Sequence, residues 1–179
     1  MMASMNRLPF FCSTPACQQG FSLAELCVVL GLLAITTGWA APALQHWLWR
    51  LRVEAVVQAW MGDLQTARLQ ALRQGQALQL QRLGACANLT PSQGDWRCGW
   101  ELRSQAKPAS PALLTQALAG EVSVQLNPPQ DWLLINAQGE TVAGGLRVVV
   151  QGKGAAPVVR SICINITGRM RVVSAVNCT

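Results

Sequence analysis

Residues 20–44 read GFSLAELCVVLGLLAITTGWAAPAL, and Glu25 is the only charged residue among them. A helix over residues 21–44 would be about 36 Å long at 1.5 Å per residue, which exceeds the roughly 30 Å of a bilayer's hydrocarbon core. We therefore expect residues 21–44 to form a transmembrane helix.

An ordinary secretory signal peptide or signal anchor is the alternative interpretation of this stretch. Such a signal carries its positive charge before the apolar run and its cleavage site after it. Here the small residue Gly20 precedes the run, Arg7 is the only charge before it, and Glu25 lies inside it. A carboxylate in lipid is costly unless it is paired. We therefore expect Glu25 to have a dedicated partner.

This pattern resembles the class III leader of type IV pilins and type II secretion pseudopilins. The resemblance implies that residues 1–20 are a leader peptide, cleaved after Gly20 by a prepilin peptidase, and that the new N-terminal Phe21 is N-methylated. It also implies that Glu25 pairs with the N-terminal amine of a neighbouring subunit during assembly. Pro42 occupies a position where pilin helices commonly carry a proline that kinks or locally melts them.

The predicted helix continues beyond the membrane as an amphipathic segment over residues 45–75. Apolar residues recur in it at spacings of four and three, which places them on one helical face: Val53, Val57, Trp60, Leu64, Ala67 and Ala71. We expect this face to pack on a β-sheet, a coiled-coil partner being the alternative. Gly75 is expected to end the helix.

After Gly75 the apolar period changes to two, which is typical of half-buried strands. Strands are predicted over residues 78–81, 96–103, 122–126, 133–135, 146–150, 162–166 and 169–173. The segment 104–120 contains two prolines and is expected to be a long loop or irregular connection. The predicted fold class is α+β, with one long N-terminal helix packed on antiparallel sheet and a β-rich domain over residues 76–179.

Three segments of this domain resemble the GspH/FimT family of pilin domains. DLQTARLQA at 63–71, followed by LQL at 78–80, resembles the opening of such domains. WRCGW at 96–100 resembles their tryptophan–glycine–tryptophan strand, and ICINITGR at 162–169 resembles their closing hairpin. The resemblance implies a type IV pilin-like fold in a single-pass inner-membrane protein. Its C-terminal domain would lie in the periplasm and assemble with other pilins into an extracellular pilus or a periplasmic pseudopilus.

Four of the seven cysteines follow the apolar run: Cys86, Cys98, Cys163 and Cys178. Beyond the membrane they can form two disulfides, for which three connectivities exist. We expect neighbours in sequence to pair, Cys86 with Cys98 and Cys163 with Cys178.

Enzyme and metal chemistry find little support in the sequence. The only histidine, His46, lies beside the predicted membrane exit, so the domain offers no Ser-His-Asp or Cys-His arrangement and no zinc site. There is no phosphate-binding glycine loop and no nucleophile elbow. The sequence therefore predicts a protein without enzymatic activity, cofactor or metal.

Charge is distributed unevenly along the chain. Residues 21–140 carry eight basic and eight acidic side chains. Residues 141–179 carry no Asp or Glu and five basic residues, which are Arg147, Lys153, Arg160, Arg169 and Arg171. Such an asymmetry favours a polyanionic partner.

The motif Gly168-Arg169-Met170-Arg171 lies within this basic segment. Glycine can adopt a positive φ in a turn, and two arginines two positions apart on a strand point the same way. Each guanidinium can hold a backbone phosphate. An ordinary hairpin turn with solvated arginines is the alternative.

The motif resembles the glycine–arginine–any–arginine motif through which FimT-like minor pilins of natural-transformation systems bind DNA. The resemblance implies that Gly168, Arg169 and Arg171 bind DNA. Arg147, Lys153 and Arg160 are further candidates, because they belong to the same basic segment. No aromatic residue follows Trp132, which favours backbone contacts to double-stranded DNA over base stacking.

Three functions are open from the sequence. The first is a type IV minor pilin that captures double-stranded DNA for natural transformation. The second is a structural minor pilin or pseudopilin that primes filament assembly. The third is a minor pseudopilin of a type II secretion system that contacts exported proteins.

Overall fold

The computed structural model describes residues 22–86, 89–107, 109–142, 145–152, 157–165 and 167–178, without the side chains of residues 39–42. Several predicted features lie outside the described residues. They are the leader, the cleavage and methylation site at Gly20 and Phe21, the side chain of Pro42, and Lys153. The chain divides into two compact units, Met1–Ala41 and Pro42–Thr179.

The first unit contains the beginning of helix α1, whose bounds are Leu23–Gln74. The Ser22 hydroxyl accepts a hydrogen bond from the backbone N–H of Ala24 at 3.2 Å, as a helix N-cap does. The hydroxyls of Thr36 and Thr37 donate to carbonyl groups of the preceding turn. The large apolar side chains of this unit are exposed, among them Leu26, Val28, Leu30, Leu33 and Ile35.

Within the described residues, no single helix is long and apolar enough to cross a membrane by itself. The segments Leu23–Gly38 and Ala43–Gln74 meet that criterion only when they are taken together.

In the second unit, α1 supplies one face of the core. The six apolar residues predicted to share a helical face are all fully buried: Val53, Val57, Trp60, Leu64, Ala67 and Ala71. The helix ends at Gln74, and Gly75 follows it with a φ of 61°. The N–H of Gln76 reaches back to the carbonyl of Ala71 at 3.3 Å, which is the closing bond of a Schellman motif.

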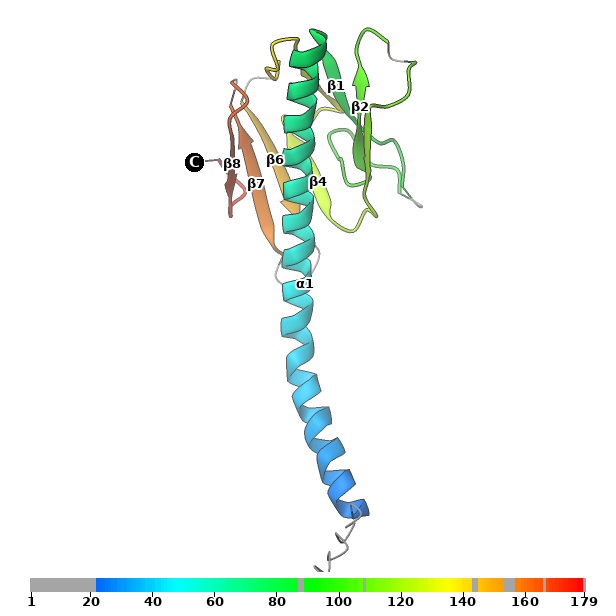
Figure 1. Ribbon diagram of the computed structural model, residues 1–179. Coiled ribbons are helices and arrows are strands. Elements are labelled where there is room, and N and C mark those ends of the chain that lie inside the picture. Colours follow the sequence, from blue (N-terminus) through cyan, green and yellow to red (C-terminus); the bar gives the residue numbers. More distant parts are fainter. Residues whose placement is uncertain are drawn as a thin grey trace, which may run out of the picture. The chain divides into compact units, whose positions relative to one another are not determined.

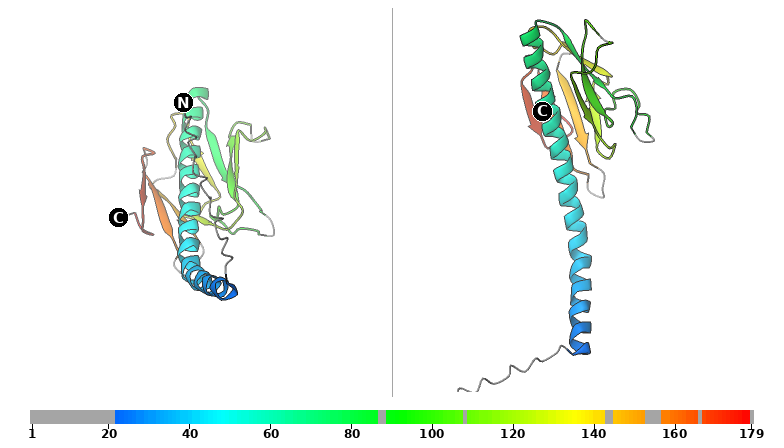
Figure 2. Two further views of the ribbon diagram at one scale, coloured as in Figure 1. Left: turned by 60° about the horizontal axis from the view of Figure 1, so that its bottom comes forward. Right: turned by 45° about the vertical axis from the view of Figure 1, so that its right-hand side comes forward.

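Two antiparallel four-stranded sheets complete this unit, and α1 runs beside both of them (Figure 1, Figure 2). The first sheet has the order β3-β2-β1-β5, with β1 Leu78–Arg82, β2 Gly99–Ser104, β3 Leu114–Ala117 and β5 Trp132–Ile135. The second has the order β4-β6-β7-β8, with β4 Ser123–Asn127, β6 Leu146–Gln151, β7 Val159–Ile164 and β8 Met170–Val173. The predicted α+β fold class is confirmed.

The prediction of a loop over residues 104–120 is wrong in part, because it contains β3. This edge strand pairs with β2 from Gly99↔Ala117 to Leu102↔Leu114. Its side chains alternate between half-buried and exposed positions, and none is fully buried. The strand is therefore held by its hydrogen bonds to β2 more than by an apolar face of its own.

The predicted strand over residues 96–103 also needs correction, because β2 begins only at Gly99. Trp96 and Cys98 are buried as their alternation predicts, but the chain turns there. Gly99 redirects the chain with a φ of 106°. The indole N–H of Trp96 donates to the carbonyl of Gln130 at 2.8 Å, so this buried donor has a hydrogen-bond partner although Trp96 lies outside the strand.

Candidate nucleic-acid interface

A row of residues crosses the β4-β6-β7-β8 sheet on the face that points away from the core. The register places Asn127 opposite Arg147, Arg147 opposite Cys163, and Cys163 opposite Arg171. Their neighbours along the strands, such as Leu146 and Val148, are buried in the hydrophobic core. Strands lie about 4.8 Å apart, so Arg147 and Arg171, two strands apart, have Cα atoms separated by about 10 Å.

The turn between β7 and β8 is fixed by local hydrogen bonds. The Asn165 carboxamide oxygen accepts from the N–H of Arg169 at 2.7 Å, and the Asn165 carbonyl accepts from the N–H of Gly168 at 2.9 Å. Gly168 has a φ of 77°, a conformation that favours glycine. Arg169 therefore lies in the turn, and only Arg171 lies on β8, which corrects the expectation that both occupy the strand.

Arg68 of α1 anchors this turn, although it is not among the predicted site residues. Its Nη1 and Nη2 donate to the carbonyls of Gly168 at 2.7 Å and Thr167 at 3.0 Å. Its Nε donates to the carbonyl of Gly139, in the turn after β5, at 2.6 Å. A Cβ added at Gly168 would lie 2.5 Å from Arg68 Cζ. The φ of Gly168 thus favours glycine, and the Arg68 guanidinium would have to shift to admit a Cβ there.

A cleft of about 790 Å³ lies along the row and the turn. Three arginines line it, Arg147, Arg169 and Arg171, and the last two are exposed. No Asp or Glu belongs to the lining, as far as the structure describes it. The cleft therefore concentrates positive charge at one end of the second sheet.

Of the eight arginines elsewhere in the described structure, five are paired with a carboxylate, while Arg50, Arg68 and Arg73 are not. Five ion pairs join an arginine to a carboxylate: Arg52–Glu121, Arg82–Asp131, Arg97–Asp95, Arg103–Glu101 and Arg160–Glu54. The hydrogen bond from Arg103 lowers the pKa of Glu101, and that from Arg82 lowers the pKa of Asp131, so both acids stay ionised at neutral pH.

The arginines of the cleft have neutral acceptors instead. Arg147 Nη1 donates to the Asn177 carboxamide oxygen at 2.9 Å, and Arg171 Nη2 donates to the Cys178 carbonyl at 3.3 Å. The Arg169 guanidinium has no hydrogen-bond partner among the residues that the structure describes. All three guanidinium groups therefore keep their full charge for an external anion.

The remaining candidates lie elsewhere. Arg160 Nε is 3.3 Å from Glu54 Oε2 beside α1, in a separate groove that Trp47 and Arg50 also line, so it does not join the cleft. Arg160 is three positions from Cys163 on β7, and an odd separation along a strand places two side chains on opposite faces. Glu25 is exposed in the first turn of α1.

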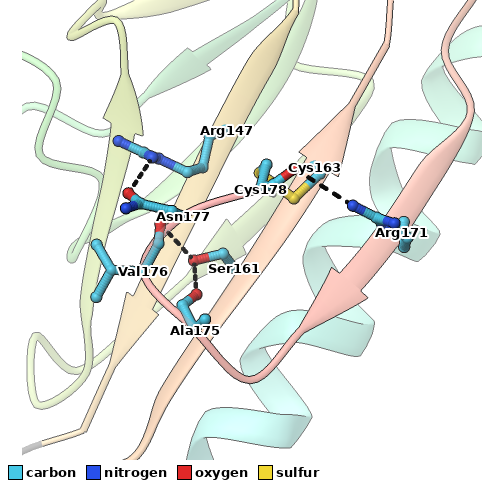
Figure 3. Close-up of a disulfide and its surroundings, with 8 residues drawn as sticks. All are labelled: Arg147, Ser161, Cys163, Arg171, Ala175, Val176, Asn177 and Cys178. Carbon is cyan, nitrogen blue, oxygen red and sulfur yellow. Dashed lines mark hydrogen bonds between the residues drawn. A yellow bond between two sulfur atoms is a disulfide. The ribbon is translucent and has the colours of Figure 1, made fainter.

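Both disulfides of this unit join cysteines that are neighbours in sequence. Cys86 is bonded to Cys98, and Cys163 to Cys178. The second bond holds the C-terminal segment 174–178 against the outer face of the sheet, between Arg147 and Arg171 (Figure 3). Within the part of the chain that is described, no group of three or more His, Cys, Asp or Glu is placed to hold a metal ion.

Comparison with known proteins gives two kinds of match. A sequence model of the GspH family, described as type II transport protein GspH, matches residues 56–168. The crystal structure of the type IV minor pilin FimU of Pseudomonas aeruginosa, strain PAO1, is similar to the chain in two crystal forms. The first has a TM-score of 0.57 at 19% identity, with 69% of this chain and 90% of that chain covered.

The second form has a TM-score of 0.55 at 19% identity, with 67% and 91% covered. No curated protein matches the chain significantly. At this identity the likeness to FimU shows the fold alone. The family match spans well over half of the chain, and pilins are structural subunits that interact with other pilins in a filament assembled from the inner membrane. The chain therefore belongs to the GspH family and is a GspH/FimT-like minor pilin or pseudopilin.

Proposed function

We propose that this minor pilin binds double-stranded DNA, without sequence preference, through Arg169 and Arg171, and that it serves DNA uptake in natural transformation. One observation carries the proposal. Arg147, Arg169 and Arg171 line one cleft without a described carboxylate, whereas five other arginines each pair with an acid. Uncompensated cations gathered in one cleft suit a polyanion.

The chemistry of the guanidinium groups favours phosphate as the ligand. A guanidinium has five N–H donors in a planar fork that fits phosphate oxygens in a bidentate manner. Arg171 uses one donor on the Cys178 carbonyl, and Arg169 uses none among the described residues, so both can hold a phosphate. Phosphate contacts carry no sequence information, and a few of them give affinities of about 1–100 μM at physiological salt.

The form of the nucleic acid follows from what lines the cleft. Stacking of single-stranded bases requires aromatic side chains. None of the described lining residues is aromatic, and no aromatic residue follows Trp132. Backbone contacts to a duplex therefore suit the cleft better than stacking on a single strand.

The assembly machinery is the second part of the proposal. The leader 1–20 is cleaved after Gly20 by the prepilin peptidase, Phe21 is N-methylated, and Glu25 pairs with the N-terminal amine of a neighbouring subunit. Before assembly, residues 21–44 hold the protein in the inner membrane as a single span. The exposed apolar side chains of the first unit support this, because they would be buried favourably in lipid or against neighbouring apolar helices.

The decisive variant is Arg169→Gln with Arg171→Gln in the full-length chain, purified in a nonionic detergent. Retardation of a labelled 30-base-pair duplex is measured at about 0.15 M salt. Two lost phosphate contacts are expected to weaken binding about 25-fold, since each contributes a factor of roughly 5 to the association constant at this salt concentration.

The matched control is Arg50→Gln with Arg73→Gln, which removes the same charge from exposed helix positions away from the cleft. Its affinity is expected to stay within about 2-fold of the wild-type value, because non-adjacent surface charges are screened at this salt. Equal retardation of the cleft variant and the wild type would overturn the proposal.

A structural minor pilin or pseudopilin that primes assembly of a pilus or of a type II secretion pseudopilus is the second candidate. Exposed apolar side chains near the end of α1 favour it, since Leu69 and Leu72 are each more than half exposed. Such positions suit contacts with other subunits. Under this alternative, neither the wild-type chain nor the arginine variants retard DNA.

A further inference from the structure

We propose that the C-terminal segment 174–178, tethered by the Cys163–Cys178 disulfide, is a positioning element of the DNA site. It holds Arg147 and Arg171 ready for phosphate and makes DNA binding depend on this disulfide. The inference rests on the proposed DNA binding of the same cleft.

The tether is placed at the centre of the cationic row. Cys163 pairs in register with Arg147 on one side and Arg171 on the other. Its disulfide partner Cys178 follows 15 residues later, after β8 has ended at Val173. The bond therefore brings residues 174–178 back over the outer face of the sheet, to the position between the two arginines (Figure 3).

A buried hydroxyl fixes the segment at a second point. Ser161 lies on β7 two residues before Cys163 and is fully buried. Its Oγ donates toward the carbonyls of Ala175 at 2.5 Å and Val176 at 3.2 Å. Because the side chains of Ala175, Val176 and Asn177 are exposed, burial of apolar surface contributes little to holding this segment.

The segment contacts one arginine on each side. The Asn177 carboxamide oxygen accepts from Arg147 Nη1 at 2.9 Å, and the Cys178 carbonyl accepts from Arg171 Nη2 at 3.3 Å. Both acceptors are neutral, so they orient the guanidinium groups without cancelling their charge. A carboxylate at either place would hold the arginine equally well but would compete with phosphate.

Release of the segment would free both arginines at once. Arginine side chains lose considerable rotamer freedom when they bind, and a side chain that is already held loses less. A segment with few buried contacts opens locally when its covalent tether is removed. Loss of the disulfide therefore separates both acceptors from the row and raises the entropic cost of binding DNA.

The test compares two cysteine-pair variants of the full-length chain in detergent. Cys163→Ser with Cys178→Ser removes the tether. Cys86→Ser with Cys98→Ser removes the other disulfide, and neither Cys86 nor Cys98 lines the cleft. Duplex affinity is measured by retardation, and folding is monitored by circular dichroism. We expect about 10-fold weaker binding without the tether, which corresponds to immobilising two more side chains. The Cys86/Cys98 variant is expected to stay within about 2-fold of the wild type.

Asn177→Ala keeps the disulfide and removes only the Arg147 acceptor, so it tests the inference even if the first variant fails to fold. We expect about 3-fold weaker binding, which is half of the loss in binding free energy expected for the Cys163/Cys178 variant. Wild-type affinity in Asn177→Ala, or in a folded Cys163/Cys178 variant, would overturn the positioning role. If Arg169→Gln with Arg171→Gln still weakens binding, the proposed function stands without it. A wild-type chain that does not retard DNA would overturn both proposals.

Discussion

Arg68→Gln is expected to lower the free energy of unfolding by about 3 kcal/mol and to weaken duplex binding together with it. The guanidinium donates to three carbonyls, those of Gly139, Thr167 and Gly168, in turns far from it in sequence. Hydrogen bonds from a charged group each contribute about 1.5–3 kcal/mol, and three on one group are less than additive. The shorter Gln side chain cannot reach all three acceptors, so carbonyls of both turns lose their partner.

Arg73→Gln is the matched control, because it makes the same change on an exposed face of the same helix. Its effect on stability is expected to stay within about 0.5 kcal/mol. Chemical unfolding of the full-length chain in detergent, followed by tryptophan fluorescence, measures both variants. DNA affinity is then compared at a temperature where Arg68→Gln remains folded, and we expect it to be reduced because the Arg169 turn is no longer anchored. Equal stability of the two variants would contradict the role assigned to Arg68.

Gly99→Ala is expected to lower the free energy of unfolding by about 4 kcal/mol or more. Gly99 has a φ of 106°, where an L side chain is strained by about 1–3 kcal/mol. A Cβ there would also overlap the carbonyl oxygen of Gln116, in the backbone of β3. Relief requires β3 to move away from β2 at the point where their ladder begins, so strain and lost hydrogen bonds add together.

Gly84→Ala is the control for this prediction. Gly84 is exposed, has no positive φ, and a Cβ there meets nothing within 4 Å. Its effect is expected to stay within about 0.5 kcal/mol. The fluorescence of the buried Trp96 and Trp100, which flank the site, reports the unfolding of Gly99→Ala at a lower denaturant concentration. Midpoints that differ by less than the experimental error would show that β3 accommodates the methyl group freely.

The helix and most strands follow from local patterns, and the sequence therefore predicts them. The buried face of α1 repeats every 3.6 residues, and all six predicted residues are fully buried. Edge strand β3 offers no such pattern because its sequence, LTQA, has no continuous apolar face. Its place is set by pairing with β2, which is a property of the partner strand. The division into two sheets depends on the same long-range pairing.

The candidate site is predicted only where its residues are close in sequence. Gly168, Arg169 and Arg171 stand in one motif, so the sequence alone is enough to select them. Arg147 joins them through strand register, whereas Arg160 turns to the opposite face of the same sheet. Arg147 and Arg160 are equal candidates in the sequence. Odd and even positions along a strand point to opposite faces, but this distinguishes the two arginines only once the buried face of each strand is known.

Arg68 escapes prediction for a related reason. Its acceptors lie 71 to 100 residues away along the chain. The one available signal is its position immediately after the buried Ala67, at the border of the apolar face, where a long cationic side chain can reach over the core. The role of the C-terminal segment is likewise not predictable from the sequence, since it depends on which strand Cys178 is tethered to.

The salt dependence of duplex binding tests most directly whether Arg169 and Arg171 hold phosphates. The logarithm of the association constant is plotted against the logarithm of salt concentration for three forms of the full-length chain. They are the wild type, Arg169→Gln with Arg171→Gln, and Arg50→Gln with Arg73→Gln. Each phosphate contact contributes about −0.9 to the slope, so the cleft variant is expected to have a slope shallower by about 1.8 while the control keeps the wild-type slope. Identical slopes for all three would show that these arginines do not contact the DNA backbone.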